Sequence, residues 1–202
     1  MRIFLFLFFV FGLAVPAAVP AMAEAPSDLI VTSARARTLS GVVYDGKYVR
    51  LTYPGGDVPA DTGVCTDVVI RTFRNALGFD FQKAVHEDMK ANFSAYPKIW
   101  GLKRPDKNID HRRVPNLETY LKRKGASLPV TQNKADYLPG DLVTWRLDGK
   151  MPHIGIVSDK KNRAGVPLII HNIGMGPQED ELLFLIPIYR HYRYLPDQVS
   201  TP

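Results

Sequence analysis

The stretch ADTGVCTDVVIRTFRNALG, residues 60–78, contains Cys65, the only cysteine of the chain. Apolar residues recur at helical spacing along it and predict a helix from about Val64 to Leu77 that stops at Gly78. Cys65 falls in the first turn of this helix. Free backbone N–H groups and the helix macrodipole favour negative charge there, so the position favours a thiolate.

Helical patterns dominate the chain around this stretch, and strand patterns dominate its last third. The predicted elements are a polar lead-in that can hold a short helix at 24–40, a hairpin around Asp45-Gly46, helices at 80–93 and 116–124, and strands at 140–147, 153–159, 166–174 and, twice, within 181–195. We expect the long connection at 96–116 to be an ordered loop. The short links between the late strands imply an antiparallel sheet. The sequence therefore predicts an α+β fold in which an N-terminal helical layer, carrying Cys65, packs on a C-terminal antiparallel β-sheet.

The first 23 residues have the features of a signal peptide. Arg2 precedes a long apolar block, and small residues up to Ala23 fit cleavage before Glu24. The alternative is an uncleaved membrane anchor, but two prolines leave about 13 continuous apolar residues where a spanning helix needs ~20. We therefore expect a periplasmic or secreted protein with one domain at 24–202 and no stable membrane span.

The overall charge is basic but leaves the partner open. Lys and Arg outnumber Asp and Glu by 26 to 20, a formal net charge of +6. A basic surface suits a polyanionic bacterial cell wall or membrane surface, although ordinary solubility also explains it. Nucleic acid is not expected, since export argues against it and no basic run is interleaved with stacking aromatics. We expect a monomer.

A single cysteine in an exported protein needs an explanation, because one thiol cannot close an internal disulfide. Cys65 is a buried inert thiol, an intermolecular link or a reactive nucleophile. A nucleophile needs a base, and His153 opens the predicted strand HIGIVSD while His171 ends the predicted strand LIIH. Neighbouring strands would bring the two rings together, with Gly155 permitting close backbone approach and His171 fixing the tautomer of His153. This set predicts a Cys–His–His triad that works through a thiolate–imidazolium pair.

The remaining histidines have other expected roles. His86 lies in an amphipathic helix and His191 in an aromatic-rich strand, so we interpret both as structural. The segment NIDHRRVPN contains His111, Arg112 and Arg113, and it fits either a substrate-binding rim or an internal salt-bridged loop. Neither a metal nor a cofactor is expected, because the chain has no HxxxH, HExxH or CxxC motif.

Two families resemble this chain. The order Tyr53-x-Gly55-Gly56, a cysteine at a helix start, PGDLVTW, HIGIVSD and IIH resembles the NlpC-type cysteine peptidases of bacterial cell walls, a branch of the papain-like superfamily. The strings NIDHRRVPNL, PGDLVTW, HIGIVSD and HNIG are similar to those of the YijF-like proteins, an exported bacterial family of uncharacterised function. The second resemblance covers almost all of the chain after residue 23, and the first covers the catalytic skeleton.

The NlpC resemblance implies a papain-like fold and a role for each matching residue. Cys65 matches the nucleophile, His153 the base and His171 the orienting third residue. Tyr53 matches a tyrosine near the nucleophile. The sequence departs from the family pattern directly before the thiol, where Val64-Cys65-Thr66 replaces Asp-Cys-Ser and the nearest acid is Asp67, on a different helical face.

The same resemblance implies a reaction and a substrate. We expect hydrolysis of an amide bond in peptidoglycan peptides through a thioester, with no cofactor. The residues expected to contact the substrate are Tyr53, Asp67, His111, Arg112, Arg113 and Asn172. Two alternatives stay open: transacylation or hydrolysis of a different amide or ester on the same thiol, and a non-catalytic cell-wall-binding module that retains the fold.

Overall fold

The structure is a computed structural model that describes residues 24–196. The helices are α1 (Pro26–Arg37), α2 (Cys65–Leu77), α3 (Phe81–Ala91) and α4 (Val114–Arg123), with short 3₁₀ helices at Phe93–Ala95, Asp110–Arg112 and Lys134–Asp136. The strands are β1 (Val43–Tyr44), β2 (Thr62–Gly63), β3 (Ser127–Leu128), β4 (Leu142–Leu147), β5 (Met151–Lys161), β6 (Pro167–Asn172), β7 (Pro177–Asp180) and β8 (Ile188–Tyr192). The predicted signal peptide at 1–23 lies outside the described residues.

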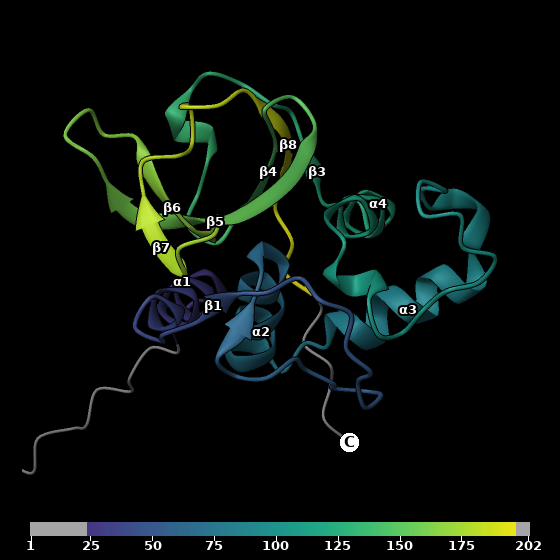
Figure 1. Ribbon diagram of the computed structural model, residues 1–202. Helices are drawn as coiled ribbons and strands as arrows, with labels where there is room; N and C mark the ends of the chain where they lie inside the picture. Colours follow the sequence, from purple (N-terminus) through teal and green to yellow (C-terminus); the bar gives the residue numbers. More distant parts are fainter. Residues whose placement is uncertain (1–23, 197–202) are drawn as a thin grey trace, which may run out of the picture.

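A six-stranded antiparallel sheet forms the centre of the fold. Its strand order is β3-β8-β4-β5-β6-β7, and β4 and β5 form a hairpin. In Figure 1 this sheet is strongly curved, α1 and α2 lie below it, and α3 and α4 lie to its right. The prediction of helices packed on a late antiparallel sheet is confirmed.

Helix α2 forms as the sequence predicts because both of its ends are stabilised locally. The carboxylate of Asp67 in its first turn accepts a hydrogen bond from the backbone N–H of Val64 at 2.7 Å. At the other end, Gly78 adopts a left-handed φ of 65° and donates its N–H to the last turn. The apolar side of α2 packs on β5 and β6, so the start of the helix is held against the sheet.

The two faces of the sheet belong to two cores. Ile154 and Ile156 of β5 join the core shared with α1 and α2, whereas Val157 joins a second core with Trp145. Because side chains alternate along a strand, His153 shares a face with Val157, and its ring lies 6.0 Å from that of Trp145. His153 therefore lies beside the second core.

Two predicted β elements differ in the structure. Asp45 and Lys47 form a turn, but no hairpin surrounds it: β1 pairs in parallel with β2, with Tyr44 opposite Gly63. The segment 181–195 contains one strand instead of two, because Leu182 and its neighbours fill the second core from a turn. The sheet also has two edge strands that were not predicted, β3 and β7, and the polar sequence PQED of β7 has no apolar alternation to reveal it.

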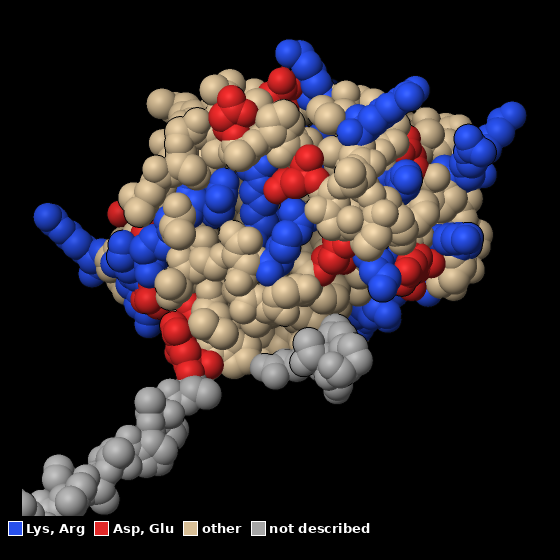
Figure 2. Space-filling model, turned by 90° about the horizontal axis from the view of Figure 1, so that it is seen from below, with Lys and Arg blue, Asp and Glu red and all other residues tan. Residues whose placement is uncertain are grey.

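The surface carries mixed charge. Figure 2 views the molecule from below Figure 1, and Lys and Arg side chains lie next to Asp and Glu side chains over most of that face. Within residues 24–196, no helix combines the length and apolar character needed to cross a membrane. Over the same residues, His, Cys, Asp and Glu side chains form no group of three or more that could hold a metal ion.

Candidate active site

Cys65 is the first residue of α2 and lies against β5. Its thiol is buried, and the backbone N–H of Ile154 is close enough to influence its pKa, so the sulfur lies beside the residue that follows His153. Burial is the dominant influence and raises the pKa of Cys65 to about 11, although the N–H groups of Ile154, Thr66 and Cys65 itself act in the opposite direction. The helix start thus assists the thiolate, but the apolar surroundings outweigh it.

His153 and His171 form a buried pair on neighbouring strands. The Nε2 atom of His153 lies 3.0 Å from Nδ1 of His171, and the two rings are nearly perpendicular. Gly155 makes this contact possible: a Cβ atom there would lie 2.5 Å from Cγ2 of Ile169 and 3.1 Å from Cβ of His171. The structure therefore brings together the two histidines that the sequence singled out.

Asp180 extends this pair, and sequence reasoning missed it. Its Oδ1 lies 2.8 Å from Nε2 of His171, and its side chain is half exposed. Asp180 of β7 pairs in register with Ile169, whereas His171 pairs with Gln178, so the contact runs diagonally between strands. His153, His171 and Asp180 thus form a line across β5, β6 and β7.

The imidazole of His153 is neutral in this environment. Burial, followed by the proximity of His171, lowers the pKa of His153 to about 3. The pKa shifts of Cys65 and His153 both favour the uncharged forms. Burial of both groups therefore favours a neutral thiol and a neutral imidazole at rest, not the thiolate–imidazolium pair expected from the sequence.

A cavity of about 320 Å³ opens beside His153. It is lined by Tyr44, Leu147, Asp148, Met151, Pro152, His153, Ile173 and Ile186. Burial raises the pKa of Tyr44, and the charge of Cys65 adds to this effect. The parallel pairing of β1 with β2 places Tyr44 opposite Gly63, which lies two residues before Cys65 at the start of α2.

The tyrosine that the NlpC resemblance assigned to the nucleophile lies elsewhere. The ring of Tyr53 packs edge-on against His86 of α3, with centroids 5.1 Å apart, and Lys107 lies over it. Tyr53 was assigned to the site because it belongs to the Tyr-x-Gly-Gly string. Only the β1–β2 pairing, which the sequence does not predict, identifies Tyr44 instead.

The remaining predicted substrate contacts are mostly internal. Arg112 donates to both carboxylate oxygens of Asp67 at 2.9 Å, and it also donates to the backbone carbonyls of Asp45 and Lys47. His111 is buried, and burial lowers its pKa to about 4. The internal-loop interpretation of NIDHRRVPN therefore describes the structure, because Arg112 binds Asp67 and His111 is buried.

Arg113 and Asn172 also have partners within the protein. Arg113 pairs with Asp110 at 3.2 Å and stacks on Trp100. Asn172 is fully buried, donates to the carbonyl of Gly63 at 3.4 Å and links the end of β6 to the segment before Cys65. Both residues support the loops around the site.

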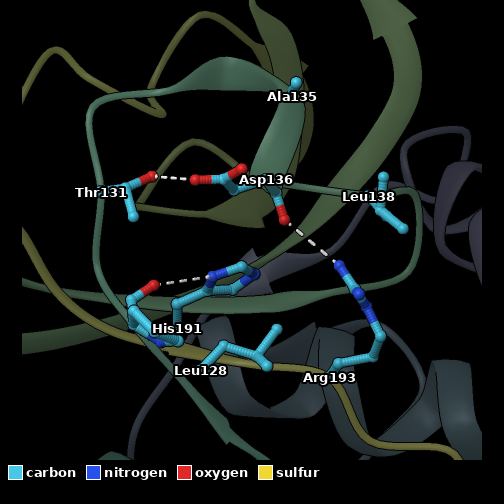
Figure 3. A pocket seen from close by; sticks show the side chains of 8 residues that line it. Leu128, Thr131, Ala135, Asp136, Leu138, His191 and Arg193 are labelled. Atoms are coloured by element: carbon cyan, nitrogen blue, oxygen red, sulfur yellow. Dashed lines mark hydrogen bonds between the residues drawn. The ribbon is translucent and has the colours of Figure 1, made fainter.

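A second pocket lies at the other edge of the sheet, around His191 (Figure 3). It has a volume of about 360 Å³ and is lined by Leu128, Pro129, Thr131, Ala135, Asp136, Leu138, His191 and Arg193. The Nε2 atom of His191 lies 2.8 Å from Asp141, and Arg193 donates to the same carboxylate. The polar groups of this pocket satisfy one another, in agreement with the structural role predicted for His191.

Comparison with known proteins places the chain in a family. The family model described as "Domain of unknown function (DUF1287)" matches residues 31–194, a range that includes the cysteine, both paired histidines and Asp180. The chain is similar to "Uncharacterized protein YijF" of Escherichia coli (strain K12), with 53% identity over 181 residues, which are 90% of this chain and 88% of that protein. No solved structure matches. The chain belongs to the DUF1287 family, which confirms its resemblance to the YijF-like proteins.

Proposed function

We propose that this protein is an exported cysteine hydrolase with a papain-like site of the NlpC type, and that it cleaves an amide bond in peptidoglycan peptides. One observation carries the proposal. The thiol of Cys65, at a helix start, lies against the residue after His153, and His153 lies 3.0 Å from His171 in the interior. A buried nucleophile, base and orienting group in this order constitute the catalytic set of a cysteine hydrolase.

The reaction begins with proton transfer from Cys65 to His153. Because both groups favour their neutral forms, the sulfur loses its proton as it attacks the substrate carbonyl, and the imidazolium and the oxyanion form together. The backbone N–H of Cys65 at the start of α2 donates to that oxyanion. Collapse breaks the C–N bond, His153 returns the proton to the leaving amine, and a thioester remains.

Water completes the cycle. His153, neutral again, accepts a proton from a water molecule that attacks the thioester carbonyl, and the thiol leaves as the C–S bond breaks. The cavity beside His153 supplies space for the acyl portion, and its mainly aliphatic walls limit the water around the thioester. The net basic charge of the chain suits a polyanionic wall as its working environment.

The decisive experiment is digestion of purified sacculi, with mass analysis of the released fragments. The protein starting at Glu24 should release peptides with new amine and carboxyl ends, and Cys65→Ala should release none while retaining its fold. Identical fragments from the alanine variant would reject the proposal. Fragments joined to an added amine would identify a transacylase, and tight binding without fragments would favour a wall-binding module.

A pair of tyrosine variants locates the cleft in the same assay. Tyr44→Phe removes the hydroxyl of a residue that lines the cavity beside His153, and it should lower the rate about tenfold, the contribution of one hydrogen bond. Tyr53→Phe removes a hydroxyl next to α3 and should leave the rate unchanged. The reverse result would mean that the substrate approaches over Tyr53, as the NlpC resemblance implies.

A further inference from the structure

The line from His153 through His171 to Asp180 has a defined direction of proton donation. A carboxylate has no proton to donate, so the 2.8 Å contact between His171 and Asp180 requires the proton on Nε2 of His171. In a neutral imidazole the other nitrogen is then an acceptor. Nδ1 of His171 therefore accepts, and Nε2 of His153, at 3.0 Å, must donate.

This sequence of donors leaves one nitrogen of His153 without a proton. With its proton on Nε2, the lone pair of neutral His153 is on Nδ1, the tautomer that a general base needs if Nδ1 receives the thiol proton. We propose that Asp180 is a positioning residue that fixes the tautomers of both histidines and so keeps His153 competent as a base. This inference rests on the proposed function, since it assigns Asp180 to the same site.

The surroundings of Asp180 single it out for this role. Its neighbour Glu179 points to the opposite face of β7, where Arg35, Ser158 and Lys160 bind its carboxylate. Asp180 contacts His171 instead, from an edge strand and with half of its side chain in solvent. Its removal therefore changes the histidine pair without opening a cavity in the core.

The spectroscopic test uses the wild-type protein, Asp180→Ala and Glu181→Gln. Glu181 is an exposed carboxylate one residue away that accepts a hydrogen bond from Asn162, so its variant is the matched control for lost charge. Two-bond ¹H–¹⁵N correlation spectra report which nitrogen of each histidine carries the proton. The wild type and Glu181→Gln should show the Nε2–H tautomer for both rings, and Asp180→Ala should show a mixture. An Nδ1–H tautomer in the wild type would overturn the proposal.

The chemical test measures alkylation of Cys65 by iodoacetamide at several pH values. Asp180→Ala should slow the reaction near neutral pH by about 10- to 100-fold, and Asp180→Glu should restore part of the rate. An unchanged rate in Asp180→Ala would also overturn the proposal. Neither readout depends on the substrate: if the tautomers and alkylation rates behave as expected but sacculi are not cleaved, only the proposed function fails.

Discussion

The protein contains two buried histidines that each contact an aspartate at the same distance, and only one pair lies near a thiol. His171 lies 2.8 Å from Asp180, and His191 lies 2.8 Å from Asp141. The second nitrogen of His171 faces His153, whereas the second nitrogen of His191 faces the carbonyl of Pro129 at 3.4 Å. An aspartate–histidine contact is thus not a site by itself; its function depends on what the other nitrogen of the ring reaches.

The two aspartates also differ in what they hold. Asp141 is almost fully buried and accepts from Arg193 and from the N–H of Leu138, which ties the start of β4 to β8. Asp180 has half of its side chain in solvent. The Asp141–His191 pair stabilises the packing of the sheet, whereas Asp180 determines which nitrogen of His171 carries the proton.

The largest expected difference between the surroundings of the His153–His171 pair and those of His191 is in the reactivity of the Cys65 thiol. His153→Ala removes the base and should reduce alkylation of Cys65, and any hydrolysis, by about 10²- to 10⁴-fold. His191→Ala removes an imidazole of similar burial and should leave both rates unchanged per folded molecule. The two variants are compared by rates measured on protein that circular dichroism shows to be folded. A similar loss in both variants would mean that His153 has no special role in the reactivity of Cys65.

The next difference is in stability, where we expect the larger effect at the Asp141–His191 pair and the smaller one at the Asp180–His171 pair. Asp141→Ala leaves Arg193 and the buried His191 without their carboxylate and should lower the free energy of unfolding by about 3 kcal/mol. Asp180→Ala should cost less than about 1 kcal/mol, because its pair is half exposed. Urea denaturation near pH 7 measures both. Equal costs would mean that the edge strand depends on Asp180 as much as the centre of the sheet depends on Asp141.

Local patterns explain which parts of the site could be predicted from the sequence. Helix α2 has an apolar stripe and a glycine stop, and strands β4 to β6 have apolar runs joined by short links, so their pairing follows from the chain itself. Once β5 and β6 pair, the contact between His153 and His171 follows, because Gly155 leaves room for it. The predicted set of one cysteine and two histidines depended only on these elements.

The missed features depend on contacts between distant segments. Asp180 belongs to a polar edge strand that exists because β6 offers a partner, and PQED contains no periodic signal. Arg112 meets Asp67 from 45 positions away, so the sequence could not distinguish an internal ion pair from a substrate clamp. Tyr44 lies opposite Gly63, two residues before Cys65, through a two-residue parallel pairing, where a turn signal at Asp45-Gly46 indicated a hairpin.

Another buried histidine, His111, sharpens the comparison, because its Nδ1 has no hydrogen-bond partner among the described residues. Burial lowers the pKa of His111 from 6.5 to about 4. Between these values the unfolded chain binds a proton that the folded protein does not, so the free energy of unfolding rises with pH over this range. The contribution of His111 is complete above about pH 6.5 and is lost as the pH falls toward about 4.

His111→Gln removes this titration and should make the protein less sensitive to acid. Between about pH 7 and pH 5, wild-type protein should lose about 2 kcal/mol more stability than the variant, as measured by urea denaturation at each pH. The comparison concerns the slope with pH, so any constant cost of the substitution cancels. Parallel curves would mean that His111 takes up its proton in the folded protein, and a buried imidazole would then tolerate charge here without a carboxylate bonded to its Nδ1.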